Sequence, residues 1–400
     1  MAQTPLCGIR VLDLTNVLSG PFCCHQLAHM GADVIKVEIP GSGDLARKLG
    51  ADAGLNDRNM GVSFLAQNAG KRSITVNLKT GGGKTLFRKL VGRCDVLVEN
   101  FRPGVMDRLG VGYESLIGDN PKLIYCAISG FGQDGPLKNL PAYDQIIQGM
   151  SGIMGITGDR DSAPLRVGYP VADTIGGLMA AFAIAAQLAA PKREAPCFLD
   201  VSLLESALST MGWVVSNLLI AGKPPLPMGN ENFTASPSGT FRTARGLINI
   251  AANKQQHFED LCRITGLEGL ISDPRFAKRE ARLKNRKDLK ERLEAALAAR
   301  TAAQWCPLFQ SAGIPSGEVL SLSEALELPQ IRDRGLIERF ENVPGTDRDI
   351  KIAAPGFKID GKTPRVEQPP PELGAHSRQI LGELGYTAEE IEALGKEMAI

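Results

Sequence analysis

Asp173 is the residue whose type and position most suggest chemistry. It lies in the segment Gly168–Ala181, where a short extended run leads into a stretch of Gly, Ala, Leu, Met, Ile and Phe. Between Gly176 and Ala190 the only strongly polar side chain is Gln187, so the pattern predicts a buried helix. A carboxylate at the mouth of such a helix must cap it, pair with another group or react. Residue type alone leaves Asp173 as either a helix cap or a nucleophile.

Other patterns that could carry chemistry are weaker. His25 and His29 have the i, i+4 spacing of a helical metal site, but no acidic third ligand accompanies them, so we predict no metal. Thr80–Thr85 imitates the end of a phosphate-binding loop, yet Leu78 stands where the first glycine is required. With four histidines and no Gly-x-Ser-x-Gly motif, a hydrolase triad has no support.

Composition excludes several classes of function. The chain has 400 residues, of which 43% are hydrophobic and 22% charged, which is typical of a soluble globular enzyme with two domains or one elaborated domain. A net charge of +1 argues against a nucleic-acid or membrane-surface partner. We find no secretory leader pattern, so we expect a cytoplasmic protein, or a matrix protein if a presequence has been removed. The eight scattered cysteines indicate reduced thiols.

The elements that must position Asp173 follow an alternating pattern in the first half of the chain. Short β-rich runs alternate with helical segments such as Phe22–His29, which predicts a parallel sheet with helices on both faces. The predicted strands are Ile9–Leu14, Asp33–Glu38, Ser73–Asn77, Asp95–Glu99 and Leu123–Ser129.

The pattern changes after Val201. One helix is predicted over Leu203–Leu219, followed by the Pro/Gly-rich linker Gly222–Gly229. The strand Leu247–Ala251 and the charged helix Leu283–Ala299 then indicate a smaller α+β domain. We therefore predict a large domain over 1–224, a small domain over 225–328 and a return to the large domain over 329–400.

Several segments, in order along nearly the whole chain, resemble class III CoA-transferases, the family of the formyl-CoA, carnitine and bile-acid CoA-transferases. The resemblance implies an α/β fold with a Rossmann-like large domain built from both chain ends, a smaller inserted domain and a homodimer of interlocked rings. The segments are Leu6–Thr15, Gly20–Pro21, Gly31–Glu38, Gly41–Asp44, Asn68–Ser73, Val98–Gly104, Ile128–Pro136, Pro141–Asp144 and Leu373–His376.

In that family the aspartate matching Asp173 is the nucleophile. The resemblance implies that its carboxylate attacks an acyl-CoA thioester to give a mixed anhydride, and that the CoA thiolate then forms an aspartyl-CoA thioester. An incoming free acid repeats the two steps in reverse and leaves as the new acyl-CoA. Neither ATP nor metal is needed, and CoA is a substrate rather than a permanently bound cofactor. The amino end of the following helix could keep Asp173 ionised.

The resemblance also implies contacts to substrate and CoA. As ordinary residue types, Lys79 and Arg108 would be surface cations and Tyr143 a core aromatic at a helix start. The implied substrate-binding residues are Leu18, Tyr143 and Gly168. The implied CoA-binding residues are Asn16, Val17, Ser19, Val76, Lys79, Asn100, Phe101, Val105, Met106 and Arg108, with Arg108 as the phosphate partner.

Departures from the formyl-CoA enzyme bear on the acceptor acid. Leu18, Ile39 and Pro141 replace its glutamine, arginine and lysine, and its run of consecutive glycines is absent, with Met228–Phe233 the nearest flexible candidate. Formyl-CoA:oxalate transfer therefore becomes an alternative. Asn253–Gln256 is more similar to succinyl-CoA-dependent enzymes, so we predict a succinyl-CoA or similar donor and a dicarboxylate acceptor.

Two further alternatives remain. An α-methylacyl-CoA racemase shares the fold and the aspartate, but it needs an acid/base group on each face of its substrate. Its histidine lies where this chain has Tyr143, and tyrosine is a poor base at neutral pH. A non-catalytic CoA-binding protein would retain Asp173 only as a cap.

Overall fold

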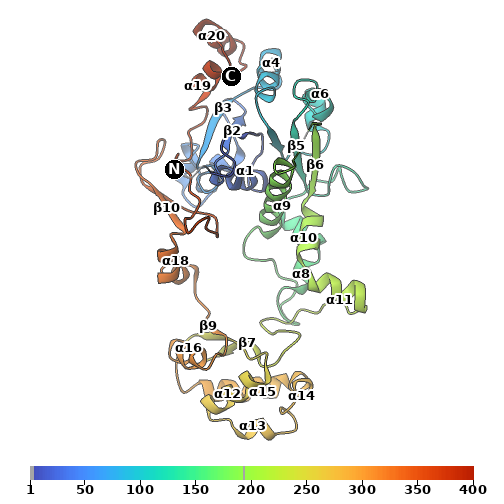
Figure 1. The fold of residues 1–400 in the computed structure, drawn as a ribbon, viewed down its shortest axis with the longest axis vertical. Helices are drawn as coiled ribbons and strands as arrows, with labels where there is room; N and C mark the ends of the chain where they lie inside the picture. Colours follow the sequence, from blue (N-terminus) through green and yellow to red (C-terminus); the bar gives the residue numbers. More distant parts are fainter. Residues whose placement is uncertain (1–3, 192–193) are drawn as a thin grey trace. The chain divides into compact units, whose positions relative to one another are not determined.

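The computed structural model of the protein describes residues 4–191 and 194–400 (Figure 1). These residues form two compact units. The larger unit contains the described residues up to Ile153, together with Arg166–Lys223 and Gln330–Ile400, and the smaller unit contains Met154–Leu165 and Pro224–Pro329. The sequence-based division at 224 and 328 does not assign 154–165 to the smaller unit.

A six-stranded parallel sheet forms the centre of the larger unit, in the order β3-β2-β1-β4-β5-β6 (Figure 1). The mixed α/β architecture predicted from the alternating pattern is thus confirmed. Strands β4 and β5 are buried along their whole length, as expected for a parallel sheet covered on both faces. The strands are β1 (Arg10–Asp13), β2 (Asp33–Glu38), β3 (Lys71–Thr75), β4 (Val96–Glu99), β5 (Ile124–Ser129) and β6 (Cys197–Ser202).

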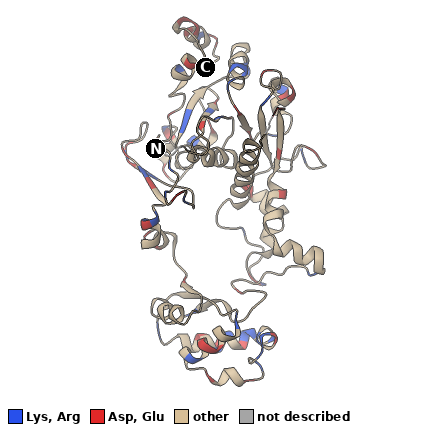
Figure 2. Ribbon diagram, viewed as in Figure 1, with Lys and Arg blue, Asp and Glu red and all other residues tan. Residues whose placement is uncertain are grey.

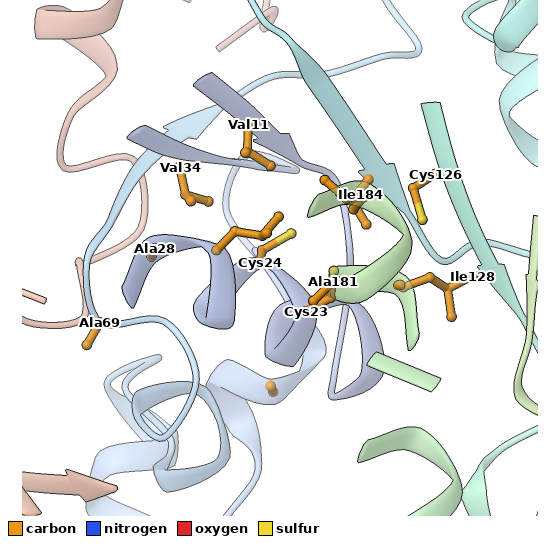
Figure 3. Packing of buried hydrophobic residues seen from close by; sticks show 14 of the residues in the cluster. Val11, Cys23, Cys24, Ala28, Val34, Ala69, Cys126, Ile128, Ala181 and Ile184 are labelled. Atoms are coloured by element: carbon orange, nitrogen blue, oxygen red, sulfur yellow. The ribbon is translucent and has the colours of Figure 1, made fainter. Parts of the chain in front are cut away.

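Helices cover both faces of this sheet. On one face, α1 (Ser19–His29) and α9 (Val171–Leu188) pack with the inward side chains of the strands (Figure 3). On the other face, α4 (Gly81–Val91) and the C-terminal α19 (Ser377–Glu383) and α20 (Ala388–Lys396) contribute to a second core. Successive strand residues alternate between the two cores, because a strand points its side chains to opposite faces.

Helix α9 differs from the buried helix that its composition predicts. Ala180 and Ile184 are buried against α1 and the sheet, but Phe182 is 70% exposed and Leu178 is also exposed. By length and composition alone α9 could cross a membrane. The prediction of a fully buried helix is wrong for the described single chain, because only one face of α9 is covered.

The predicted helix Leu203–Leu219 is two helices instead of one. Helices α10 (Leu203–Thr210) and α11 (Trp213–Ala221) are bent by 79° relative to each other. The break falls at Gly212, whose φ of 41° is accessible to glycine and interrupts the helical path.

The smaller unit has its own antiparallel sheet and core. Its strands β7 (Ser238–Arg242), β8 (Leu247–Ala251) and β9 (Ser316–Glu318) pair in that order. The main helices are α12 (Gln255–Thr265), α15 (Arg286–Leu297) and α16 (Ala302–Ser311), which bury Phe258, Leu293 and Trp305. The predicted helix Leu283–Ala299 is divided because α14 (Arg279–Lys284) ends before α15 begins.

The remaining elements are shorter. Strands β10 (Ile337–Phe340) and β11 (Ile350–Ala353) form an antiparallel pair in the larger unit. The short helices are η1 (Leu45–Lys48), α2 (Ala53–Asp57), α3 (Val62–Leu65), α5 (Val105–Leu109), α6 (Tyr113–Leu116), α7 (Asp144–Met150), α8 (Ile153–Ile156), α13 (Gly269–Ser272), α17 (Leu322–Leu326) and α18 (Pro329–Arg334).

Candidate active site

The strand order reverses between β1 and β4, and the loops after these two strands are joined there. Asn16 donates its backbone N–H to Oδ1 of Asn100 at 2.8 Å, and Nδ2 of Asn100 donates to the carbonyl of Asn16 at 2.8 Å. The same Nδ2 lies 3.5 Å from Oγ of Ser19 at the start of α1. In open parallel sheets, ligands bind at such a reversal, outside the carboxyl ends of the strands. The structure thus brings together Asn16, Ser19 and Asn100 at a ligand-binding position of the fold.

The other residues implied for CoA binding lie around the same edge of the sheet. Phe101 follows Asn100, and Val105 and Arg108 lie on α5, which comes next in the chain. Arg108 and Lys79 are exposed, with Lys79 in the loop after β3. Val76 and Met106 differ, because their side chains are buried in the core between the sheet and α4. A ligand could meet these two residues only through their backbones.

Asp173 is a residue of the first helical turn rather than the cap of α9. The helix begins at Val171, and its amino end is capped by another acid, Asp144, the first residue of α7. Oδ1 of Asp144 accepts the backbone N–H groups of Ala172 at 2.9 Å and Asp173 at 3.3 Å. Among the described residues, the carboxylate of Asp173 itself accepts no hydrogen bond. The amino end of α9 is therefore capped by Asp144 and not by the side chain of Asp173.

The electrostatic setting of Asp173 differs from the expectation that the helix end keeps it ionised. Partial burial, and secondly the neighbouring carboxylate of Asp144, raise the pKa of Asp173 to about 7. Both causes disfavour the charged form, and they outweigh the attraction of the helix amino end. A substantial fraction of Asp173 is therefore protonated at neutral pH in the protein without substrate.

Two adjacent glycines allow α9 to approach its neighbours. A Cβ at Gly177 would lie 2.5 Å from the carbonyl oxygen of Ser19, and one at Gly176 would lie 2.1 Å from Leu203. Asp173 lies one turn before Gly177, so it occupies the face of α9 that is turned towards the start of α1. Leu18 directly precedes α1. The close packing therefore joins the start of α1, directly after Leu18, to the turn of α9 that follows Asp173.

Tyr143 and Gly168 flank Asp173 on exposed segments. Tyr143 is 69% exposed and precedes Asp144, so it is not the core aromatic that its residue type suggests. The loop containing Gly168 is held by Gln148, whose Oε1 accepts the N–H of Val167 at 2.9 Å. Nε2 of Gln148 donates to Asp144 at 2.6 Å.

Sequence reasoning missed the roles of Asp144 and Gln148. Their i, i+4 spacing was a usable signal for a helical pair, but it carries no information about the distant Ala172 and Val167 that they bind. The histidines of the candidate metal pair, His25 and His29, are buried with the two Nε2 atoms 3.1 Å apart. In the described parts of the chain, no group of three or more His, Cys, Asp or Glu residues is arranged to hold a metal.

Comparison with known proteins decides the family. Residues 6–377 match the family model described as CoA-transferase family III. The chain belongs to CoA-transferase family III. The resemblance read from the motifs is thus confirmed, and the protein is a CoA-transferase by family.

Individual relatives cover nearly the whole chain of this CoA-transferase. It is 38% identical to the succinyl-CoA:glutarate CoA-transferase of Mus musculus, over 98% of this chain and 89% of the relative. It is 40% identical to the acetyl-CoA:oxalate CoA-transferase of Acetobacter aceti, over 87% of this chain and 89% of the relative. The crystal structure of a CAIB/BAIF family protein from Brucella suis superimposes with a TM-score of 0.83 at 32% identity, covering 96% of this chain and 100% of that chain.

Proposed function

We propose that this protein transfers CoA from an acyl-CoA donor to a dicarboxylic acid through covalent intermediates on Asp173. The observation that supports this most strongly is that Asp144 and Asp173 have different hydrogen-bonding roles at the start of α9. Asp144 caps the amino end of α9, and this leaves the carboxylate of Asp173 without a hydrogen-bond partner among the described residues. A nucleophilic carboxylate needs such freedom, because a lone pair committed to capping is less available for attack.

The reaction proceeds in four balanced steps. The carboxylate of Asp173 attacks the thioester carbonyl of the donor, forming a mixed anhydride and releasing the CoA thiolate. The thiolate attacks the aspartyl carbonyl, which forms an aspartyl-CoA thioester and releases the donor acid. The acceptor carboxylate attacks this thioester to give a second anhydride and the thiolate. Attack of the thiolate on the acceptor carbonyl then forms the new acyl-CoA and regenerates Asp173.

The edge of the sheet at β1 and β4 is the proposed binding position for CoA. Asn16, Ser19 and Asn100 lie where this fold class binds its ligands. Exposed Lys79 and Arg108 are cations at the same edge of the sheet, and we assign them to the phosphate groups of CoA. Their exposure leaves the side chains free to reach a charged ligand.

The proposed substrates are based on the substrates for which the relatives are named. The relative from Mus musculus is named for succinyl-CoA and glutarate, and the one from Acetobacter aceti for acetyl-CoA and oxalate. All the acceptors in these names are dicarboxylic acids. We therefore propose succinyl-CoA as donor and a dicarboxylate such as glutarate as acceptor, with oxalate as the alternative acceptor.

A transfer assay tests this proposal and separates it from the other functions. The protein is incubated with succinyl-CoA and each of a panel of dicarboxylic acids, and new acyl-CoA is measured by chromatography. We expect new acyl-CoA with wild-type protein and loss of it with Asp173→Asn. Exchange of an α-proton of a branched acyl-CoA without transfer would indicate a racemase instead. Binding of CoA with neither reaction would indicate a non-catalytic protein.

We further propose that two copies of the chain form a homodimer of interlocked rings. The uncovered face of α9 and most of α11 are apolar, and α11 carries no charged residue (Figure 2). Trp213 is 78% and Ile220 is 85% exposed in the single chain. Exposed apolar side chains of this kind are typical of a protein interface, and a second copy is the occupant that the resemblance implies.

A further inference from the structure

Val17 has a backbone conformation that a valine avoids. Its φ of 67° lies in the left-handed region, where a β-branched side chain collides with its own backbone. Val17 lies in the loop between β1 and α1, directly after Asn16 and directly before Leu18. Such strained residues persist only where the surrounding structure holds them, and they occur preferentially at functional sites.

Asp44 and Lys36 both form hydrogen bonds with the backbone of this loop. Oδ1 of Asp44 accepts the backbone N–H of Val17 at 3.0 Å, and also that of Ala46 at 2.9 Å. Nζ of Lys36 lies 2.9 Å from Oδ2 of Asp44 and donates to the carbonyl of Thr15 at 2.9 Å. Lys36 is thus bonded to the residue two before Val17 and to the carboxylate that binds Val17 itself.

This pair is fully enclosed and part of a larger charged cluster. Lys36 is 0% and Asp44 is 1% exposed, and a second buried pair, Lys71 and Asp13, has its nitrogen and oxygen 2.8 Å apart. Oδ1 of Asp13 accepts the N–H of Thr15 at 2.9 Å, so both ion pairs are hydrogen-bonded to the backbone of the loop. Although burial alone would raise the pKa of Asp44, Lys36 and the N–H groups of Val17 and Ala46 lower it below its ordinary value.

Buried ion pairs of this kind add little to stability, because desolvation offsets much of their attraction. Stability therefore does not explain why two lysines and two aspartates are buried beside one loop. The loop leads directly into the amino end of α1, where Ser19 meets Gly177, one turn from Asp173. The loop therefore ends at the helix start that packs against α9, one turn from Asp173.

We infer that Asp44 and Lys36 are positioning residues, which hold Val17 in its left-handed conformation and so set the 16–18 loop against Asp173. This inference rests on the proposed function of Asp173. In the transfer reaction the loop would orient the thioester carbonyl for attack, and misplacement of a reacting group by about 1 Å can cost roughly 100-fold in rate. Neither residue contacts the reacting atoms.

A rescue experiment tests the inference. Asp44→Ala should lower kcat for transfer by about 100-fold, because Val17 loses its acceptor and relaxes out of the left-handed region. Adding Val17→Gly to Asp44→Ala should raise kcat again by about tenfold, because glycine adopts the left-handed conformation without strain. Rates are normalised to folded protein, and Val17→Gly alone supplies the reference for the double variant.

A matched control separates positioning from stability. Asp33 lies at the opposite end of β2 and pairs with Arg10 and Arg72, at 2.9 Å and 2.7 Å. Asp33→Ala should lower the thermal midpoint while kcat of the folded protein stays at the wild-type value. If Asp44→Ala does not fold, the comparison is made with Lys36→Met. Adding Val17→Gly to Lys36→Met should also reverse the decrease in kcat.

Two outcomes would overturn the inference. One is wild-type kcat in folded Asp44→Ala, and the other is a loss that Val17→Gly does not reduce. Failure of the proposed function is seen separately: if Asp173→Asn transfers CoA at the wild-type rate, the covalent mechanism is wrong whatever the Asp44 variants do.

Discussion

The proposed chemistry of the site depends on two acids with different roles. Asp144 satisfies the first N–H groups of α9, and Asp173, inside the first turn, keeps its carboxylate free. Burial, and secondly the closeness of Asp144, raise the pKa of Asp173 to about 7. A raised pKa makes a carboxylate more nucleophilic once ionised, at the cost of a smaller ionised fraction at low pH.

The pH dependence of transfer should therefore report Asp173. We expect kcat/KM to fall on the acidic side with an apparent pKa of about 7, because the protonated acid cannot attack. Asp144→Asn removes the neighbouring charge while an asparagine still caps α9. The acidic limb should then move to lower pH, because the like charge that disfavours ionisation is gone. An unmoved limb in Asp144→Asn would show that Asp144 does not control this titration.

Stability should also depend on Asp173. Its pKa is raised from 3.8 in the folded state, so its contribution is most favourable below about pH 4 and is lost as pH rises to about 7. Asp173→Asn should raise the free energy of unfolding at pH 8 by about 2 kcal/mol, roughly half of what the shift implies, because the side chain is partly exposed. Urea unfolding at about pH 8 and pH 4 measures the difference, which should vanish at the lower pH. A variant that is no more stable than wild type at pH 8 would contradict the raised pKa.

At the scale of elements, the approach of α9 to α1 positions Asp173. Gly177→Ala places a Cβ 2.5 Å from the carbonyl oxygen of Ser19, a contact that backbone atoms cannot relieve locally. We expect a loss of about 1–3 kcal/mol in stability, together with reduced kcat because α9 shifts relative to α1.

The control for this variant is a helical glycine with open space around it. A Cβ at Gly382 in α19 would meet nothing within 4 Å, so Gly382→Ala should be stabilising by about 0.4–1 kcal/mol. Denaturant unfolding and transfer rates for both variants test the close packing. Wild-type stability and kcat in Gly177→Ala would show that the helices can separate without consequence.

Local pattern predicted some elements well and others poorly. The predicted strands Asp33–Glu38 and Leu247–Ala251 coincide with β2 and β8, because alternating β-branched residues end there at turn residues. The break at Gly212 was missed, since a glycine within an apolar helical pattern is compatible with a helix interior as well as with a break. The capping role of Asp144 was not recognised, because Asp144 is remote from Asp173 in sequence and close only in the fold.

At the scale of the whole molecule, order-preserving motifs predicted the family and the mixed α/β fold, but local pattern overestimated burial. The composition of α9 is that of a core helix, yet one of its faces is uncovered in the described single chain. Periodicity cannot distinguish a side chain covered by its own chain from one covered by another copy. The prediction of a fully buried helix therefore fails at the face of α9 that we propose forms part of the dimer interface.

The oligomeric state can be tested on α11. Trp213→Glu combined with Ile220→Glu places two charges on an apolar exposed helix, so we expect a dimer of wild-type protein to become a monomer. Light scattering after size-exclusion chromatography measures the mass. Leu322→Glu is the matched control, because Leu322 is also exposed but lies on α17 of the smaller unit, and it should leave the dimer intact. A wild-type monomer would refute the dimer proposal.

The central claim is that Asp173 carries CoA covalently during transfer. The direct measurement is peptide mass spectrometry after the protein reacts with succinyl-CoA and is quenched in acid, with a parallel sample treated with hydroxylamine. We predict a CoA thioester on the peptide containing Asp173, its conversion to a hydroxamate by hydroxylamine, and neither product in Asp173→Asn. Transfer that proceeds at the wild-type rate with Asp173 unmodified, or an adduct on a different residue, would contradict the account.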